Sequence, residues 1–506
     1  MNLSLPTRRF LSVFSVLACF LFIFSCKKEK FNTSSSFQLS FNKDTVLFDT
    51  VFTTIGSTTE YLKVYNTSNE TVKIESIRLR DGSSSQFRIN VDGDNGTSFS
   101  NIEIAGNDSL FIFVEVTVDP GNTNTPFVVE DFIDFTVNGN EQEVVLNAWG
   151  QDAYYHGGIG ALTVLDCDEV WNPDKPHIVY GIVAVDSACT LTINAGTSVY
   201  CHAKSGLYIY KGKLYVNGEL GNEVLFRGDR LESFYIDQPG QWGIQIEGIV
   251  LSGGAPTVAS VSRGGIWINQ SPESRINYAI IRNAGMGLQV DSTGVDYNSG
   301  AFSTTVLNTK IENCSGIGLW GRGGSIQATN LLVSNCGQSC AYFSIGGKYK
   351  MDNCTFADYW GLGSRTGAAC AIDNYYEDVN GNIQVRSLIN TVFTNCIMYG
   401  NNALLNDFNE LAIDLASPES QSLFFDYCLV DTDINVDQDS RFVNCINGIA
   451  PPFCDGSSFN FKLSNNASSV VGKPNGVGQD IRGVTNGDWK GCYDFFLGSS
   501  NDPCAD

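Results

Sequence analysis

The sequence predicts an all-β chain in which an antiparallel sandwich precedes a long stack of β coils. The stack is indicated by four similar stretches, residues 276–283, 307–314, 329–336 and 389–396, each rich in aliphatic residues and ending in or near Asn-Cys. Internal repeats at roughly this spacing are the signature of a solenoid. The sandwich is indicated by alternating apolar and polar runs before residue 153, and the 51 glycines against 13 prolines suit short strands joined by tight turns.

The N-terminus predicts export. Arg8 and Arg9 precede an apolar run over residues 10–24, which ends at Ser25 and Cys26. This run has about 15 residues, fewer than the roughly 20 that span a bilayer, so residues 1–25 are expected to be cleaved. The Ser25-Cys26 junction resembles a bacterial lipobox, which implies that Cys26 carries lipid, although ordinary secretory cleavage remains an alternative.

By the same resemblance, Lys27 implies that the protein is sorted to the outer membrane. The protein would lie there on either the periplasmic or the outer surface. Residues 26–36 are expected to form a tether.

Residues 37–153 are expected to form the sandwich, with strands near 60–65, 71–75, 110–116 and 143–147. The segment 64–72, with Asp108-Ser-Leu, resembles the immunoglobulin-like domains of bacterial surface lipoproteins, which implies a spacer or adhesive module. Residues 92–96 lack the glycine and closing glutamate of an EF-hand, so a polar hairpin turn is expected in place of a calcium loop.

The coil is expected over residues 158–454. A shift of 31 (307 minus 276) aligns Asn277 with Asn308, Gly285 with Gly316 and Gly287 with Gly318. The asparagines are expected to bond to the backbone of the next turn, and the glycines to adopt the left-handed torsions of sharp corners.

These coils resemble right-handed parallel β-helix proteins of the pectate-lyase-like superfamily. Residues 226–230 and 241–246 are similar to an uncharacterised exported subgroup, in which a segment like 455–506 forms a C-terminal cap. The predicted fold class is therefore an immunoglobulin-like β-sandwich followed by a right-handed parallel β-helix with a C-terminal cap.

Fourteen of the 16 cysteines remain once Cys19 and Cys26 are set aside. Those at matching repeat positions are expected to form a buried ladder of small apolar side chains: Cys314, Cys336 and Cys396. Disulfides are expected instead among residues that flank loops and the chain end: Cys336, Cys340, Cys445, Cys454, Cys492 and Cys504.

A net charge of −23 and the lack of a basic stripe exclude nucleic acid as a partner. Zinc is not expected, because the three histidines lack ligand spacing and no paired CxxC motif occurs. Calcium is the one cofactor considered. Five oxygen-bearing side chains alternate and would share one face of an extended segment: Asp431, Asp433, Asn435, Asp437 and Asp439. Asp433, Asp437 and Asp439 are the expected ligands, while a solvated acidic loop is the alternative.

Aromatic residues are the usual platform for sugar rings. Four tryptophans along the coil are candidates for such a platform, but packing in the core is the favoured expectation for them: Trp242, Trp267, Trp320 and Trp360. Tyr375 and Tyr376 are expected to be exposed and, with Asp378, to bind ligand on a polar loop at 373–380 that interrupts the coil.

The sequence thus predicts a lipid-anchored cell-envelope protein that presents a β-helix for glycan binding or adhesion. No catalytic residue is identified. The resemblance keeps open a polysaccharide lyase or glycoside hydrolase acting on acidic polysaccharide, and a structural envelope component without ligand is a third alternative. The expected partners are membrane lipid, through the anchor, and a polysaccharide.

Overall fold

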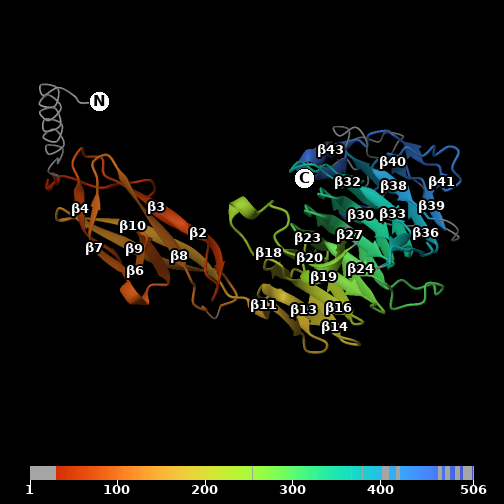
Figure 1. Ribbon diagram of the computed structural model, residues 1–506, viewed down its shortest axis with the longest axis horizontal. Helices are drawn as coiled ribbons and strands as arrows, with labels where there is room; N and C mark the ends of the chain where they lie inside the picture. Colours follow the sequence, from red (N-terminus) through yellow and green to blue (C-terminus); the bar gives the residue numbers. More distant parts are fainter. Residues whose placement is uncertain are drawn as a thin grey trace, which may run out of the picture. The chain divides into compact units, whose positions relative to one another are not determined.

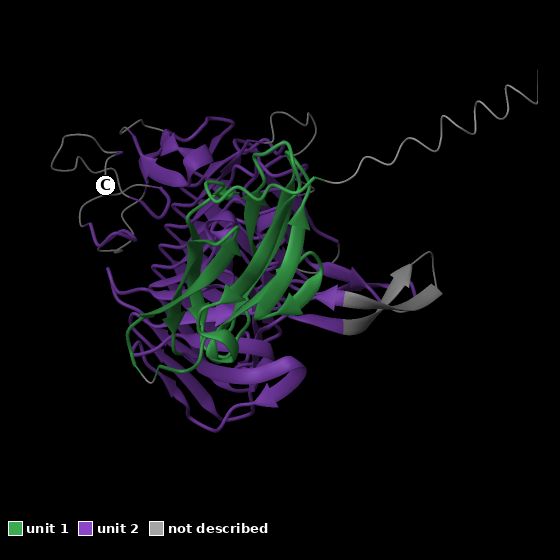
Figure 2. Ribbon diagram, turned by 90° about the vertical axis from the view of Figure 1, so that its left-hand side faces the viewer, with its two compact units in different colours: residues 1–152 green, residues 153–506 purple. Residues whose placement is uncertain are grey.

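The computed structural model describes residues 30–121, 123–252, 255–365, 367–378, 380–401, 409–416, 422–464, 470–472, 479–484, 490–493 and 504, without the side chains of 247–260. The predicted signal segment and Cys26 lie outside these residues. Within the described ranges there is no α-helix, and hence no helix long and apolar enough to cross a membrane. The chain divides into two compact units, Met1–Asp152 and Ala153–Asp506 (Figure 2).

Unit 1 is a sandwich of two five-stranded sheets. The first sheet has the order β1 (Ser40–Phe41), β3 (Glu60–Tyr65), β8 (Ser109–Val116), β5 (Phe87–Val91) and β6 (Asp94–Gly96). The second has the order β2 (Thr45–Phe52), β10 (Asn140–Gln151), β9 (Phe127–Val137), β4 (Val72–Leu79) and β7 (Ser98–Ile104), and a 3-10 turn, η1 (Gly82–Ser84), follows β4. Inward side chains of both sheets form one apolar core.

The polar hairpin turn predicted at residues 92–96 is confirmed. Val91 pairs with Asp94, so Asp92 and Gly93 form a two-residue loop between β5 and β6. Both have positive φ, 54° and 93°, as a tight hairpin requires.

Unit 2 is a parallel β-helix with three strand faces, which we call A, B and C (Figure 1). Face A contains β11 (Tyr154–Val164), β13 (His177–Val185), β16 (Gly206–Tyr210), β21 (Ile266–Asn269), β24 (Leu288–Asp291), β27 (Ile317–Arg322), β30 (Ser339–Ser344), β33 (Cys370–Asp373) and β38 (Leu411–Asp414). Face B contains β15 (Ser198–Cys201), β18 (Val224–Gly228), β23 (Ala279–Arg282), β26 (Lys310–Glu312), β29 (Leu332–Ser334), β32 (Thr355–Asp358), β37 (Ile397–Gly400), β40 (Leu429–Val430) and β42 (Ile446–Asn447).

Face C contains β12 (Val170–Trp171), β14 (Thr190–Asn194), β17 (Lys213–Asn217), β22 (Ser274–Asn277), β25 (Thr304–Leu307), β28 (Ser325–Thr329), β31 (Lys348–Asp352), β36 (Thr391–Thr394), β39 (Leu423–Asp426) and β41 (Phe442–Val443). Two hairpins, β19 (Gln245–Ser252) with β20 (Ala255–Ser262) and β34 (Tyr375–Glu377) with β35 (Ile383–Val385), and the 3-10 turn η2 (Ser233–Tyr235) interrupt the coils. A complete coil runs from face C to face B to face A, and one apolar core fills the interior. The predicted fold class is therefore confirmed.

Asparagine ladders mark the corners of the coil. Asn330 Nδ2 donates to Asn308 Oδ1 at 2.9 Å where face C turns into face B, and Asn313 Nδ2 donates to Asn283 Oδ1 at 2.8 Å where face B turns into face A. These four asparagines have φ between 47° and 62°. In these pairs the bonds run from amide to amide. The predicted bonds to the backbone of a neighbouring turn also occur, since Asn335 Oδ1 accepts from the Tyr359 N–H at 3.0 Å and Asn277 Nδ2 donates to the Gly218 carbonyl at 3.2 Å.

The predicted role of the glycines, in contrast, is wrong. Gly287 and Gly318 do not have positive φ, because asparagine already takes the left-handed position at the corner. They are glycine because a Cβ on Gly318 would lie 2.4 Å from Val333 Cγ1 and 2.9 Å from Cys336 Sγ. Space inside the coil, and not backbone torsion, excludes a larger residue here.

The predicted shift of 31 is right for only part of the coil. Leu288 pairs with Leu319, a shift of 31, but Ile276 pairs with Val306 and Ile281 with Ile311, a shift of 30. One additional residue in the corner after Asn313 accounts for the difference.

The repeat at 389–396 occupies a different face from its apparent equivalents. Its strand, β36, lies on face C, whereas β26 and β29 lie on face B. Asn395 accordingly stacks on Asn353, at 3.4 Å, in the corner between faces C and B. The corner between faces C and B and the corner between faces B and A both require an asparagine followed by a small residue. The sequence alone therefore did not distinguish the two corners.

The buried-ladder prediction for Cys314, Cys336 and Cys396 agrees with the structure, in which all three are free and buried. Burial raises the pKa of the Cys396 thiol well above its usual value, so it packs as a neutral side chain. The disulfide predictions for Cys336, Cys340, Cys445 and Cys492 are wrong, because these thiols pack in the apolar core or against the segments that cover it. Among the described residues, disulfides join Cys167 to Cys189 and Cys454 to Cys504.

The C-terminal cap contains β43 (Phe453–Asp455), η4 (Gly456–Ser458) and β44 (Asn460–Leu463). Leu463 and Val470 cover Ile397 and Leu429 near the last coils. Further along the chain, Phe461, Ile481, Cys492 and Tyr493 pack on Leu332 and Ala357 of face B. The cap thus covers the side of several coils as well as the last ones.

Candidate functional site

The outer surface of face A presents a row of aromatic side chains at matching strand positions. Strand pairing places Tyr208 opposite Trp267, Trp267 opposite Gln289, Gln289 opposite Trp320, and Trp320 opposite Tyr342. The Tyr208 and Trp267 ring centroids lie 4.4 Å apart, and those of Trp320 and Tyr342 lie 6.2 Å apart. Gln289, between the two pairs of rings, is fully buried, and its Oε1 accepts from the Gly264 N–H at 2.8 Å. The exposed rings therefore form two pairs, and five neighbouring strands at about 4.8 Å spacing place the outermost rings roughly 19 Å apart.

These rings are outside the core because of strand alternation. Trp267 lies between the buried Ile266 and Ile268, and Trp320 follows the buried Leu319. The prediction that both tryptophans belong to the core is therefore wrong, whereas Trp242 is a core residue with 2% exposure. The alternation of apolar and other residues in residues 266–269 and 319–322 was the signal in the sequence that distinguishes them.

A second, polar row follows two positions further along each strand. It consists of Tyr210, Asn269, Asp291, Arg322 and Ser344, and continues through Asp373 and Asp414. Asp291 joins the two rows, since Oδ2 accepts from Trp267 Nε1 at 3.1 Å and pairs with Arg322 Nη1 at 3.2 Å. Trp320 Nε1 donates to Ser344 Oγ at 3.0 Å, so both indole rings are held in place by hydrogen bonds.

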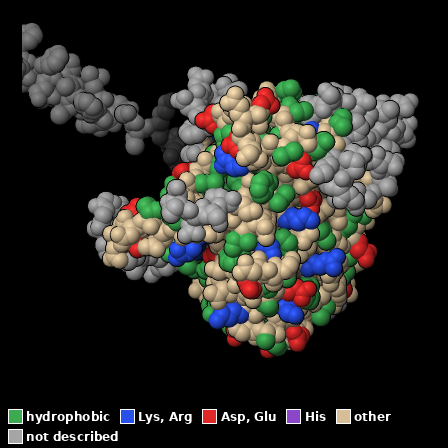
Figure 3. Space-filling view, turned by 90° about the vertical axis from the view of Figure 1, so that its right-hand side faces the viewer, with side chains coloured by type: hydrophobic (Ala, Val, Ile, Leu, Met, Phe, Trp, Pro, Cys, Tyr) green, Lys and Arg blue, Asp and Glu red, His purple; other side chains and the backbone are tan. Residues whose placement is uncertain are grey.

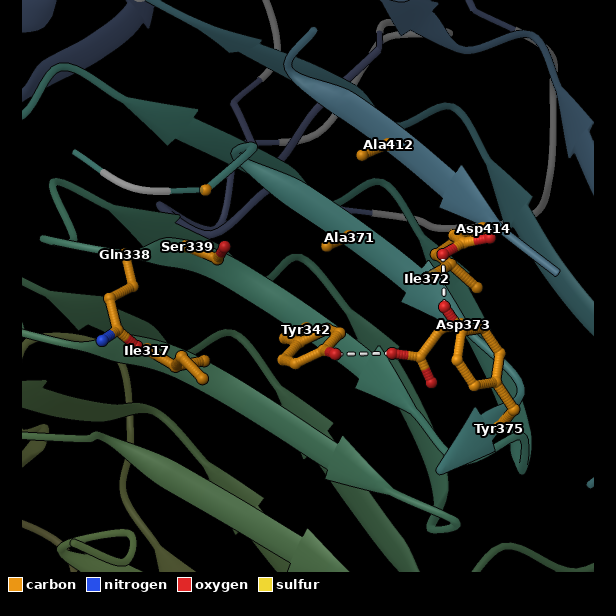
Figure 4. A pocket seen from close by; sticks show the side chains of 11 residues that line it. Ile317, Gln338, Ser339, Tyr342, Ala371, Ile372, Asp373, Tyr375, Ala412 and Asp414 are labelled. Carbon is orange, nitrogen blue, oxygen red and sulfur yellow. Dashed lines mark hydrogen bonds between the residues drawn. The ribbon is translucent and has the colours of Figure 1, made fainter. Parts of the chain in front are cut away.

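The aromatic row ends at a cleft of about 450 Å³ over β30, β33 and β38 (Figure 4). Tyr342 and Asp373 point toward each other, and the Tyr342 hydroxyl donates to Asp373 Oδ2 at 2.5 Å. The Tyr375 hydroxyl donates to Asp414 Oδ2, also at 2.5 Å. Strand pairing places Asp373 directly opposite Asp414, so the two carboxylates are neighbours on one cleft wall.

The electrostatics of this pair suit proton transfer. Burial raises the pKa of the Asp373 carboxyl above its usual value, and Asp414 raises it further, although the hydrogen bond from Tyr342 opposes the shift. Asp414 is exposed. The Ile345 N–H also donates to Asp373 Oδ1 at 2.8 Å and opposes the rise in pKa. Two neighbouring carboxyl groups, one of them with a raised pKa, are the residue types that hydrolysis of a glycosidic bond uses.

A buried ion pair supports the loop beside this cleft. Arg365, 5% exposed, binds Glu410 through Nη1 and Nη2 at 2.6 and 2.5 Å, and its guanidinium lies 3.4 Å from Asp358. Glu410 also accepts from the Ala369 backbone N–H at 3.0 Å. These contacts fix the segment that contains Gly367, which lines the cleft.

A second cleft of about 660 Å³ lies at the edge where face A turns into face C. Its lining residues include Asp291, Arg322, Tyr297 and Arg386. The Arg386 guanidinium lies 5.4 Å from the Tyr376 ring centroid, and Nη2 donates to the Tyr376 hydroxyl at 3.2 Å.

The predicted ligand-binding residues lie together on the β34–β35 hairpin, but they differ in availability. Tyr375 lines the first cleft. Tyr376 contacts Arg386 of the second. Asp378 accepts from the backbone N–H groups of Asn380 and Asn382 and from Gln384 Nε2, which lowers its pKa and occupies its oxygens within the hairpin turn.

The acidic stretch at 431–439 does not form the extended strand on which the calcium prediction depended. It turns, with the Asn435 carbonyl accepting from the Gln438 and Asp439 N–H groups. Asp439 binds Arg441, with distances of 2.6 to 3.1 Å. No cluster of three or more acidic, histidine or cysteine side chains suited to a metal occurs in the part of the chain that the structure describes. A role for Asp433 and Asp437 stays a prediction.

Figure 3 shows Lys and Arg side chains interspersed with Asp and Glu side chains on one side of the molecule. Neither sign forms a continuous area among the described residues of that side.

No family model matches this chain, and no curated protein matches it. Among solved structures, it is similar to the Agl-KA catalytic domain (9% identity, 73% of this chain and 80% of that chain, TM-score 0.24). It is also similar to the catalytic unit of a GH87 α-1,3-glucanase from Streptomyces thermodiastaticus (10% identity, 73% and 83%, TM-score 0.19). Over shorter stretches it spans 57% of the periplasmic chaperone SfaE (12% identity, 22% of this chain, TM-score 0.16).

The chain also spans 27% of a family 123 glycoside hydrolase from Clostridium perfringens (8% identity, 26% of this chain, TM-score 0.18). All these TM-scores are below 0.5.

Proposed function

We propose that this chain is a lipid-anchored protein of the bacterial outer membrane that binds a polysaccharide along face A of its β-helix. The observation that supports binding most directly is the row of Tyr208, Trp267, Trp320 and Tyr342, held at matching positions on the outer surface. The anchor is inferred from the sequence, in which the apolar run at 10–24 is followed by Ser25-Cys26, and the outer membrane from Lys27.

The chemistry of the surface suits a sugar polymer. Rings pack against the apolar C–H faces of pyranoses, and the neighbouring polar row supplies donors and acceptors for hydroxyl groups. A row of roughly 19 Å accommodates several sugar units. Because the coils repeat along one axis, a linear chain that lies parallel to that axis can contact both pairs of rings, on either side of the buried Gln289.

Binding is tested with the double variant Trp320→Ala/Tyr342→Ala. The mature chain is screened by affinity gel electrophoresis against polygalacturonate, alginate, xylan, chondroitin sulfate and dextran. The variant should lose at least about tenfold in affinity for any polysaccharide that the wild type binds. Phe424→Ala is the matched control, since Phe424 is 47% exposed but lies on face C. Equal loss in both variants would contradict the proposal.

A second function, hydrolysis of the bound glycan, is supported by the adjacent Asp373 and Asp414 in the first cleft. Asp373 would donate a proton to the glycosidic oxygen, and Asp414 would act as base or nucleophile. New reducing ends should appear with the wild type and disappear in Asp373→Asn and in Asp414→Asn. If the wild type binds a polysaccharide but releases no new reducing ends, hydrolysis is excluded for it and only the binding function remains.

A further inference from the structure

The first sheet of unit 1 carries apolar side chains on a face where polar ones are expected. Along β8, Leu110, Ile112 and Val114 are buried, and the residues between them point outward. Two of these outward residues are Phe111 and Phe113, which are 42% and 45% exposed. Along a strand of an antiparallel sheet, buried apolar residues normally alternate with polar residues that face solvent. Two neighbouring exposed phenylalanines on the solvent face therefore require an explanation.

The neighbouring strand extends the same surface. On β3, Tyr61 pairs with Phe113 and Lys63 pairs with Phe111, and Tyr61 is 48% exposed. The Phe111 and Phe113 rings are almost parallel, 13° apart with centroids at 6.3 Å, and the Tyr61 centroid lies 5.9 Å from that of Phe111.

Two lysines border these rings. Lys63 Nζ lies 4.9 Å from the Phe111 centroid, and Lys43 Nζ lies 5.3 Å from that of Tyr61. Lys43 is paired with Glu60 at 3.1 Å, whereas no described carboxylate forms an ion pair with Lys63. The surface therefore combines flat rings with ammonium donors in a chain whose net charge is −23.

We propose that Tyr61, Phe111 and Phe113, with Lys43 and Lys63, form a second polysaccharide-binding surface, on unit 1. The rings contact the apolar faces of sugars, and the ammonium groups donate to their hydroxyl or anionic substituents. This surface is on a different unit from face A and does not depend on the function proposed there.

A second copy of the chain fits this surface poorly. The exposed parts of the three rings amount to roughly 300 Å², well below the about 800 Å² per partner of a stable interface. A two-fold interface would also bring the lysines of one copy close to those of the other. Insertion into a membrane would remove the Lys43–Glu60 ion pair from water, which a hydrated sugar chain does not require.

The test uses the full mature chain in the Trp320→Ala/Tyr342→Ala background, so that face A does not mask the second surface. Phe111→Thr/Phe113→Thr keeps strand propensity and removes both rings. Trp149→Thr is the matched control, since Trp149 is 46% exposed on β10 of the other sheet. Affinity for the same five polysaccharides is measured by gel electrophoresis, and thermal unfolding checks each variant.

We expect the Phe111/Phe113 variant to lose residual polysaccharide binding by at least about tenfold while Trp149→Thr retains it. Should the double variant unfold, Lys63→Ser replaces it, with a smaller loss in the same direction. The proposal would be overturned if the Phe111/Phe113 variant bound polysaccharide as well as its Trp320→Ala/Tyr342→Ala background. It would also be overturned if that background bound no polysaccharide. Two other results would also overturn it. In the first, the wild type forms a dimer in sedimentation that the Phe111/Phe113 variant does not form. In the second, the variant loses binding to phosphatidylglycerol vesicles but keeps binding to polysaccharide.

Discussion

Trp320 and Tyr342 lie opposite each other on β27 and β30 with their ring planes only 3° apart. The relationship follows from the parallel register, which places outward residues of successive coils above one another. The same register on face A brings Tyr208 beside Trp267 and Asp373 beside Asp414. The stacking of outward residues in successive coils therefore accounts for both the aromatic row and the carboxylate pair.

The two classes of tryptophan should respond differently to truncation. Trp242→Ala removes a side chain that is 2% exposed and should cost about 3–5 kcal/mol of unfolding free energy. Trp267→Ala removes a ring on the outer surface, so we expect a smaller loss of stability, with reduced polysaccharide affinity. Denaturant unfolding and affinity electrophoresis on both variants give the comparison. A Trp267→Ala variant as unstable as Trp242→Ala would place Trp267 in the core after all.

The interior glycines should tolerate no side chain. A Cβ on Gly318 would lie 2.4 Å from Val333 Cγ1 and 2.8 Å from the Cys340 carbonyl oxygen, so Gly318→Ala should destabilise unit 2 by about 1–3 kcal/mol. Gly300→Ala is the control, because nothing lies within 4 Å of its Cβ position and its φ is not positive. Thermal unfolding of the two variants measures the difference, and equal midpoints would show that the coil relaxes around the added methyl group.

The sequence predicted the fold class because repeats and alternation are local patterns. It did not predict the phase of the repeats, since residues 389–396 on face C satisfy the same corner rule as 307–314 on face B. It also could not separate buried thiols from disulfides. Cys336 and Cys340 are close in the chain and both point into the core, and only the path of the coil decides that they remain free.

The candidate site was predicted only in part. Tyr375 does line the first cleft, and Tyr376 contacts Arg386, which lines the second. Both tyrosines belong to the hairpin that interrupts the coils after β33. Tyr342 and Asp414 were missed. They come from strands separated by about two coils, so no local pattern joins them.

The buried ion pair beside the first cleft should be costly to break. Arg365→Met leaves Glu410 and Asp358 without their cation in a site where both are fully buried, and a loss of about 3–5 kcal/mol is expected. Arg441→Ala, which removes a surface pair with Asp439, should cost about 1 kcal/mol or less. Chemical denaturation of the two variants compares them. A small loss for Arg365→Met would indicate that water enters and solvates both carboxylates.

Two stacked histidines at the start of the β-helix should make stability fall in mild acid. His156 Nε2 and His177 Nδ1 are 2.9 Å apart and both rings stack on Trp171. Burial lowers the pKa of each to about 4, below the unfolded value near 6.5. Their contribution is therefore complete above pH 6.5 and is lost as pH falls toward 4, by at most about 1.4 kcal/mol per histidine per pH unit.

His202 provides a control of opposite sign. Its hydrogen bond with Asp229, at 2.7 Å, raises the pKa of the imidazole, so its contribution is present at low pH and is lost as pH rises through the raised pKa. Between pH 7 and pH 5, His156→Gln/His177→Gln should therefore reduce the fall in unfolding free energy, and His202→Gln should enlarge it. Denaturant unfolding at the two pH values measures both. An unchanged pH dependence in the double variant would mean that the stacked pair protonates as readily in the folded chain as in the unfolded one.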